Sequence, residues 1–168
     1  MDTIISENII YKCTSQGMML KLNNVFENNI VADILAPPRG YYLSLREGPL
    51  TGARIKNNIF YSTEPVVDYI NELGSKKKGK SEDRRGRKLA LVQDADADYN
   101  LYYCKSDPKL ASDMVKEQHG KGVGKHSIAA DPLFQNIEEG NFTLAEDSPA
   151  LKLGFKPIDQ STIGLIKK

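Results

Sequence analysis

Three things are scarce in this 168-residue sequence: an excess of charge of one sign, cysteine, and long apolar runs. The 23 basic and 22 acidic residues leave a formal net charge of +1, so no field of the whole molecule attracts it to nucleic acid or to an anionic membrane. The two cysteines, Cys13 and Cys104, lack CxxC spacing, which favours small buried thiols over a disulfide framework. No apolar run is long enough to span a bilayer. We therefore expect neither nucleic acid nor a membrane as a partner.

The first eight residues also lack a basic region followed by an apolar stretch, so they do not form a signal peptide as written. They resemble the middle of a repeat instead. On this pattern we expect the chain to begin inside a larger architecture, as the C-terminal part of a longer protein. Its first coil would then present an unpaired edge, which allows self-association.

The most informative pattern is a repeat in which an asparagine precedes a short apolar run. The intervals between the aligned asparagines are 21, 29 and 42 residues, which suits coils of a little over twenty residues with loops of varying length. One coil of three short strands cannot bury its inward face alone, whereas stacked coils form a continuous core. Asparagine suits the turn because it tolerates the left-handed conformation and its amide can bond the next coil. The predicted structural ladder consists of Asn8, Asn29, Asn58 and Asn100.

A second repeated element supports the first. Residues 17–22 (GMMLKL) and 40–45 (GYYLSL) match position for position, each a glycine followed by alternation with a period of two. If one set of alternate side chains stacks inward, the other set forms an outward row, which we expect to meet a ligand. A plain solvated sheet face is the alternative. The predicted outward row contains Met19, Lys21 and Asn23 beside Tyr42, Ser44 and Arg46.

The rest of the chain divides by composition. Residues 1–105 carry the coils, interrupted near 74–88 by a strongly basic segment that we expect to be a solvated loop. A clamp for an anionic polymer is the alternative for this segment, but it lacks interleaved aromatic residues. Residues 106–120 predict one short helix that begins at a capping residue followed by proline. Residues 121–168 supply the last coil and an irregular C-terminal cap, so we expect residues 1–168 to form a single domain.

Three alternating carboxylates, Asp94, Asp96 and Asp98, suggest a calcium site. Strict alternation in an extended chain places such side chains about 7 Å apart on one face, too far apart to share one ion without a turn. The glycine and the distant glutamate of an EF-hand loop are also missing. We predict no metal site and no cofactor, and calcium is the alternative without a supporting motif.

The closing part of the chain resembles a known group of proteins. Residues 126–134 (HSIAADPLF), 140–144 (GNFTL) and 148–155 (SPALKLGF) look like the closing segment of secreted bacterial right-handed parallel β-helix proteins, including pectate-lyase-like lyases and β-helix glycoside hydrolases. The resemblance implies an all-β fold, a right-handed parallel β-helix (solenoid) with one short helix. It also implies a secreted or periplasmic location and a poly- or oligosaccharide partner. It is specific for architecture rather than for the reaction, because many activities share this scaffold.

The candidate chemistry follows from the two reactions of that group. Glycoside hydrolysis needs two carboxyl groups, for which Asp33, Glu47 and Asp68 are available. A lyase needs a base and a cation that neutralises a uronate. We predict Arg46, Lys21 and Glu47 as catalytic candidates, and Tyr42, Asn23 and Arg54 as substrate-binding candidates.

These residues predict the C-terminal β-helix portion of a polysaccharide-active enzyme, with hydrolase ahead of lyase, in which the isolated fragment need not be active. A non-catalytic glycan-binding or structural module is the alternative. Neither histidine lies near a recognisable nucleophile motif. His126 falls in the cap sequence, where we expect a structural hydrogen bond, and His119 ends the predicted helix, where a positive charge suits the helix dipole.

Overall fold

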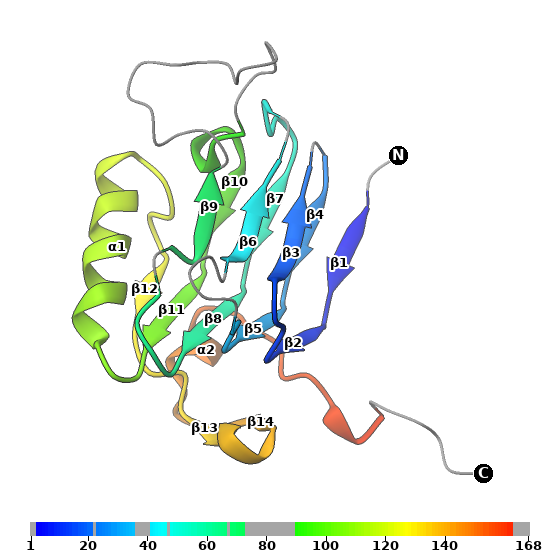
Figure 1. Ribbon diagram of the computed structural model, residues 1–168, viewed down its shortest axis with the longest axis vertical. Coiled ribbons are helices and arrows are strands. Elements are labelled where there is room, and N and C mark those ends of the chain that lie inside the picture. Colours follow the sequence, from blue (N-terminus) through cyan, green and yellow to red (C-terminus); the bar gives the residue numbers. More distant parts are fainter. Residues whose placement is uncertain are drawn as a thin grey trace.

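The computed structural model describes residues 3–21, 23–35, 41–46, 48–66, 68–72 and 90–162. The fold is dominated by β-structure in parallel sheets, with two short helices (Figure 1). The chain runs through three parallel sheets in turn, and we call each set of successive strands a layer. Layer 1 is β1 to β3, layer 2 is β4 to β6, layer 3 is β7 to β9, and layer 4 contains β10 and β11.

The first sheet has the strand order β1-β4-β7-β10. Its register places Ile5, Phe26, Ile55 and Ala97 in one column, one residue from each layer. Phe26, Ile55 and Ala97 belong to the main hydrophobic core and Ile5 packs against it, because successive side chains of a strand point to opposite faces and this column faces inward. The strands are β1 (Ile4–Ser6), β4 (Val25–Glu27), β7 (Arg54–Lys56) and β10 (Asp96–Asp98).

The second sheet has the order β2-β5-β8-β11-β12 and carries apolar side chains on both faces. Val31, Phe60 and Tyr102 lie in the main core, where the rings of Phe60 and Tyr102 stack with centroids 5.1 Å apart. Their neighbours Ile30 and Ile59 belong to a second core on the outer face. The strands are β2 (Ile9–Tyr11), β5 (Ile30–Ala32), β8 (Ile59–Ser62), β11 (Leu101–Cys104) and β12 (Ile128–Ala129).

The third sheet has the order β3-β6-β9, with β3 at Gln16–Leu20, β6 at Tyr41–Leu45 and β9 at Ile70–Glu72. The two repeated segments pair in parallel, but their register differs from the position-for-position alignment by two residues: Met18 pairs with Leu43 rather than Tyr41, and Leu20 pairs with Leu45 rather than Leu43. Gly17 lies within β3 rather than in a turn.

The four aligned asparagines form a continuous chain of hydrogen bonds. Asn29 Oδ1 accepts from the backbone N–H and the Nδ2 of Asn8, both at 3.0 Å. Asn58 Oδ1 accepts the same pair from Asn29 at 3.0 and 3.1 Å, and Asn100 Oδ1 accepts it from Asn58 at 3.0 Å. The last backbone N–H, that of Asn100, donates to Ser127 Oγ at 3.1 Å. Each asparagine thus joins two layers, and three of the four are buried.

The left-handed position of the turn differs from the one predicted. The ladder asparagines themselves do not have positive φ; the residue just before each one does, with φ between 53° and 58°. This frees the ladder side chain for bonds to the next layer, while the preceding residue makes the bend between the first and second sheets. Asparagine is favoured at such positions, but two of the four are other residues. The left-handed residues are Glu7, Asn28, Asn57 and Tyr99.

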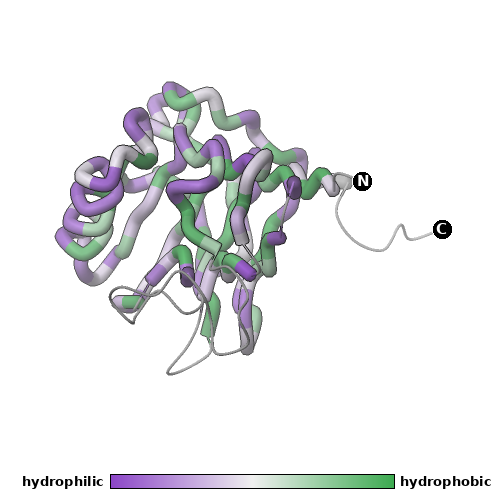
Figure 2. The backbone as a smooth tube through the Cα atoms, turned by 90° about the horizontal axis from the view of Figure 1, so that it is seen from above, coloured by the Kyte–Doolittle hydropathy of each residue, from purple (hydrophilic) through white to green (hydrophobic). Residues whose placement is uncertain are grey.

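Helix α1 (Pro108–Gly120) lies within the predicted helical range and packs on β11 and β12. Asp107 caps it, accepting from the Leu110 N–H, and proline occupies the first turn. Ala111 and Val115 are buried in the main core, so the helix closes one end of the layers. Figure 2 shows the tube largely hydrophilic over α1 and more apolar along the strands.

The C-terminal segment covers the outer face of the second sheet rather than an end of the stack. Its Ile137, Phe142 and Phe155 join the second core with Ile30 and Ile59. The apolar outer face of the second sheet explains this placement, because a parallel sheet with two apolar faces needs cover on both. The elements are β13 (Phe134–Asn136), η2 (Ile137–Glu139), β14 (Asn141–Leu144), α2 (Pro149–Lys152) and η3 (Gln160–Thr162), while η1 (Val92–Asp94) precedes β10.

Several predictions fall on particular parts of this arrangement. Cys104 is buried and Cys13 is half-buried, and both are free thiols. The basic segment near 74–88 and the catalytic candidate Glu47 lie outside the described residues. Within the described ranges, no helix is long and apolar enough to cross a membrane.

Candidate functional site

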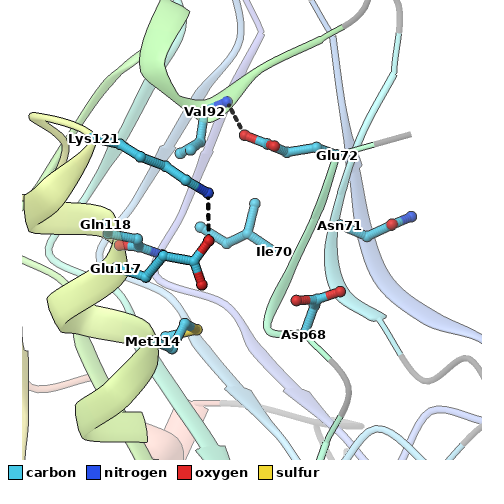
Figure 3. Close-up of a pocket in the computed structure, with 9 residues that line it drawn as sticks. All are labelled: Asp68, Ile70, Asn71, Glu72, Val92, Met114, Glu117, Gln118 and Lys121. Carbon is cyan, nitrogen blue, oxygen red and sulfur yellow. Dashed lines mark hydrogen bonds and ion pairs between the residues drawn. The ribbon is translucent and has the colours of Figure 1, made fainter. Parts of the chain in front are cut away.

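A pocket of about 200 Å³ lies between α1 and the last strand of the third sheet (Figure 3). Met114, Glu117 and Gln118 line it from α1, and Lys121 lines it from the residue that follows the helix. The opposite wall is β9 with Asp68 before it, and Val92 of η1 completes the lining. The volume lies below the usual range of roughly 300–1,000 Å³ for small-molecule sites. The pocket therefore suits a single small polar group or one sugar ring.

Carboxylates dominate the chemistry of this pocket. Asp68, Glu72 and Glu117 line it, and Lys121 is the cation among the described lining residues. Lys121 Nζ lies 2.8 Å from Glu117 Oε1, and this hydrogen bond is the main cause that raises the pKa of Lys121 above its ordinary value. Partial burial acts in the opposite direction, and the negative charges of Glu72 and Asp68 add to the increase. The carboxylates of the pocket thus favour the charged form of Lys121.

Glu72 occupies a position that the other layers give to leucine. The register of the third sheet pairs Leu20 with Leu45 and Leu45 with Glu72. Both leucines are fully buried, whereas Glu72 is half-buried and its Oε1 accepts a hydrogen bond from the Val92 N–H at 2.7 Å. Figure 3 shows this side chain reaching from β9 toward the backbone of Val92. The series of paired residues Leu20, Leu45 and Glu72 therefore ends in a carboxylate that a hydrogen bond holds in place at the wall of the pocket.

The neighbouring column also ends in a polar group. Asn71 of β9 pairs in register with Ser44 of β6, and both side chains are buried. In the described structure neither Asn71 Nδ2 nor Ser44 Oγ has a hydrogen-bond partner. Leaving such a group unpaired costs about 1–3 kcal/mol, and ordered water or a ligand group is the usual partner. Asn71 also contributes to the pocket wall, but alternation along β9 directs its side chain to the face opposite Ile70 and Glu72, and Figure 3 shows it pointing away from α1.

The predicted outward row on β3 and β6 is not an exposed surface at its centre. Tyr42 is only 1% exposed, and its ring packs edge-on against Tyr69 with centroids 5.0 Å apart. Ser44 is fully buried as well. Both sets of alternate side chains in β6 are covered, so the alternation did not distinguish a buried face from a wet one. A sugar cannot stack on the face of Tyr42 in this arrangement.

Of the other candidates, Lys21 and Arg46 are neighbours at the ends of β3 and β6, because Leu20 pairs with Leu45 and the Arg46 N–H donates to the Leu20 carbonyl at 2.9 Å. Lys21 and Asn23 are exposed in the segment that follows β3, and Arg46 is half-buried directly after β6. Arg54 belongs to the first sheet, where its Nε lies 3.2 Å from Glu27 Oε1. The structure therefore places Arg54 and Tyr42 in different sheets rather than in one groove. Among the carboxylate candidates, Asp68 lines the pocket, whereas Asp33 accepts from the N–H and hydroxyl of Thr63 and stabilises a turn.

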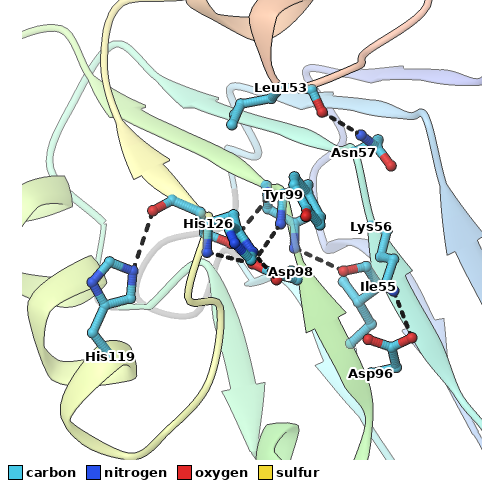
Figure 4. A network of polar contacts seen from close by, with 11 residues as sticks. Ile55, Lys56, Asn57, Asp96, Asp98, Tyr99, His119, His126 and Leu153 are labelled. Atoms are coloured by element: carbon cyan, nitrogen blue, oxygen red, sulfur yellow. Dashed lines mark hydrogen bonds and ion pairs between the residues drawn. The ribbon is translucent and has the colours of Figure 1, made fainter.

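A second polar cluster lies at the last layer of the first sheet (Figure 4). Asp98 Oδ1 accepts from the backbone N–H groups of Tyr99 and His126 at 2.9 and 2.7 Å, and Asp98 Oδ2 lies 2.7 Å from His126 Nδ1. The His126 ring stacks on Tyr99, with centroids 4.6 Å apart and an angle of 7° between the planes. His119 Nε2 lies 3.2 Å from the Ser127 carbonyl oxygen. His126 thus ties the segment before β12 to the end of β10.

The alternating aspartates do not converge on one point. Asp94 lies in η1, Asp96 pairs with Lys56 at 2.6 Å, and Asp98 pairs with His126. Within the described residues, no group of three or more potential ligands could hold a metal ion. The three carboxylates have separate partners or positions because the chain turns through η1 before it enters β10.

Comparisons with known protein families, with curated proteins and with solved structures gave no match. The functional argument therefore rests on the contacts and chemistry of the pocket.

Proposed function

We propose that the four layers are coils of a right-handed parallel β-helix, and that the chain is the C-terminal portion of a secreted or periplasmic polysaccharide-active protein. Two observations support this proposal. In layers 1 to 4, a strand pairs in parallel with the strand three places later along the chain. The asparagine ladder joins those layers at one turn, as stacking in register requires.

The acidic pocket is our proposed sugar-binding site, and the carboxylates of Asp68, Glu72 and Glu117 around one cavity carry the proposal. Carboxylates are acceptors that suit sugar hydroxyl groups, which are donors. An acidic sugar would bring its own carboxylate, which is also an acceptor, against this acceptor-rich lining and would be disfavoured. The pocket therefore favours an uncharged poly- or oligosaccharide.

Hydrolysis suits this lining better than elimination does. A glycosidase needs two carboxyl groups beside the scissile bond, and Glu72 and Glu117 approach the pocket from different elements, β9 and α1. A lyase needs a cation free to neutralise a uronate, whereas Lys121 is paired with Glu117. We therefore place glycoside hydrolase ahead of polysaccharide lyase, on the chemistry of the pocket alone.

A binding experiment tests the site. Calorimetric titration with neutral oligosaccharides and with oligogalacturonates should detect binding of the neutral sugars only. Glu117→Gln should weaken that binding roughly tenfold, which corresponds to the loss of one charge-assisted hydrogen bond. The matched control is Asp113→Asn, which removes an exposed carboxylate from the same helix outside the pocket. Equal affinity of the native protein and Glu117→Gln, or preference for the acidic sugar, would contradict the proposal.

An activity experiment separates hydrolase from binding module. Release of reducing ends from the bound polysaccharide indicates hydrolysis, whereas an unsaturated uronate product indicates a lyase. If binding is present and turnover is absent, the chain acts as a non-catalytic glycan-binding module. Loss of turnover in both Glu72→Gln and Glu117→Gln, with the fold intact by circular dichroism, would identify the carboxyl pair.

A further inference from the structure

The two ends of the stack of layers differ: a helix packs on one end, and edge strands form the other (Figure 1). At one end α1 packs on β11 and β12 and buries Ala111 and Val115 in the main core. At the other end β1, β2 and β3 are edge strands, and within the described residues each pairs with one neighbour only. Edge strands of this kind leave backbone donors and acceptors without ladder partners.

The uncovered end is also apolar. Ile4 and Met19 are 69% and 43% exposed, which is unusual for large apolar side chains in this protein. Ile5, Ile10 and Met18 pack against the main core but are only partly buried. The residues that pair with them in layer 2 are fully buried. Layer 1 shields layer 2 from solvent, but no layer of the described structure shields layer 1 in the same way. These fully buried partners are Phe26, Val31 and Leu43.

The asparagine ladder specifies what would fit there. In each deeper layer the asparagine Oδ1 accepts from the preceding asparagine, and its Nδ2 donates to a strand carbonyl of the preceding layer. Asn8 shows neither bond within the described residues: its Nδ2 donates to Ser6 O and Asn29 Oδ1, and its Oδ1 receives no donor. The ladder at the other end is closed, because Ser127 Oγ accepts from Asn100.

We infer that the layer 1 end is a docking surface for a further β-coil that runs parallel to β1, β2 and β3 and carries its own asparagine turn. Such a coil supplies an N–H and an amide Nδ2 for Asn8 Oδ1 and a carbonyl for Asn8 Nδ2. Its inward apolar residues complete the cover of Ile5, Ile10 and Met18. The occupant is thus defined by two hydrogen-bonding requirements and one apolar requirement.

A second copy of this chain does not meet these requirements. Two copies related by a two-fold axis would reverse the direction of the ladder at their interface, so Asn8 Oδ1 would face a second Asn8 rather than the N–H and Nδ2 of a preceding ladder asparagine. A head-to-tail arrangement would bring layer 1 against α1, which covers the opposite end. The complement must therefore be a parallel coil with a free trailing edge, joined on the N-terminal side of β1.

A fusion tests the surface directly. Ile4 pairs with Val25, so residues 4–24 make up one complete layer. Placing a second copy of residues 4–24 directly before Ile4 supplies a coil in the required register. We expect Tm to rise by roughly 2–4 °C, because one extra stacked interface stabilises the repeat and a chain of this size responds with a shift of that order. Hydrogen exchange of the peptides that cover β1 to β3 should slow at the same time.

The matched control is the same fusion with one change: in the added copy of residues 4–24, the asparagine that corresponds to Asn8 is replaced by alanine. Asn8 of the original layer 1 is unchanged. This control should lose at least half of the gain in Tm. An added copy that exchanges like an unstructured tail, with Tm unchanged, would overturn the inference, and so would an equal gain with the alanine copy. Analytical ultracentrifugation of the unfused protein tests the alternative occupant. A dimer that dissociates in the Ile10→Lys variant would overturn the inference and would identify a second copy of the chain as the occupant.

Discussion

Asn28 and Lys156 exchange two hydrogen bonds although 128 residues separate them in the sequence. Asn28 Nδ2 donates to the Lys156 carbonyl at 2.9 Å, and the Lys156 N–H donates to Asn28 Oδ1 at 2.6 Å. Asn57 makes a similar contact one layer on, donating to the Leu153 carbonyl at 2.8 Å. The left-handed residues at the layer turns therefore hold the C-terminal segment against the outer face of the second sheet. This contact stabilises the second core, because that core exists only while the segment is docked.

We expect Asn28→Ala to destabilise the protein by about 2–4 kcal/mol, because it removes both bonds and places a side chain that disfavours positive φ at 56°. Urea denaturation measures this change. Asn28→Gly is the control that keeps the left-handed conformation accessible and removes only the bonds. It should cost less than Asn28→Ala, and a cost within error of zero for both variants would contradict the role of this contact.

The position of an asparagine in the ladder should determine how much its loss costs. Asn58 is 1% exposed and bonded to layers on both sides, whereas Asn8 is exposed and bonded on one side. We expect Asn58→Ala to lower the free energy of unfolding by about 2–4 kcal/mol, because several buried partners lose their bonds together. Asn8→Ala should cost about 1 kcal/mol or less. Equal costs in urea denaturation would show that the ladder does not act as a buried unit.

A glycine in β3 is required by close packing rather than by a turn. A side chain on Gly17 would clash with the Tyr42 carbonyl oxygen and would lie 2.8 Å from Val31 Cγ1. We therefore expect Gly17→Ala to lower the free energy of unfolding by about 1–3 kcal/mol, the usual cost of overpacking. Gly120→Ala is the matched control, because an added Cβ there meets nothing within 4 Å. If the two variants have the same thermal midpoint, the close approach of β3 to β6 is wrong.

The pair of Asp98 and His126 should make stability depend on pH. Partial burial raises the pKa of Asp98, but hydrogen bonds from the His126 ring and from the His126 and Tyr99 N–H groups outweigh it, so the pKa lies below the ordinary value of 3.8. Folding thus lowers this pKa. The resulting stabilisation is complete above the unfolded-state pKa of about 3.9 and is lost as pH falls through the folded-state value.

Urea denaturation of the native protein and of Asp98→Asn at several pH values measures this effect. We expect the difference in free energy of unfolding to be largest near neutral pH and to shrink below about pH 4. Asp113→Asn serves as a comparison: the hydrogen bond from Lys109 also lowers the pKa of Asp113, but this pair is exposed to solvent, so its effect on stability should change much less with pH. A difference that stays constant from neutral pH down to about pH 3 would contradict the assigned bonds.

The sequence predicted the parts of the fold that repeat. The aligned asparagines determine the register of their sheet, because a ladder residue must recur once per layer, whereas the two alternating segments pair two residues away from their predicted alignment. The C-terminal segment was predicted as an end cap, yet it covers a face. Short strands such as β5 and β8 are apolar at nearly every position, so their sequence does not say that the outer face also needs a partner.

The candidate site was harder to predict. Tyr42 looked outward by alternation, but both sets of side chains in β6 are buried, and a period of two does not identify which set is covered. One signal was present in the sequence: in the column of Leu20 and Leu45, the next layer has Glu72. A carboxylate at a leucine position marks a break in the core. The approach of Glu117 could not be predicted, because it depends on where α1 packs.

Contacts between layers test the account most directly. In a nuclear Overhauser spectrum, backbone protons of Ile30 should lie close to those of Ile59, and those of Ile59 close to those of Leu101, because these residues pair in parallel across layers. Absence of these contacts, together with antiparallel contacts between β4 and β5, which follow each other in the sequence, would contradict the layered arrangement.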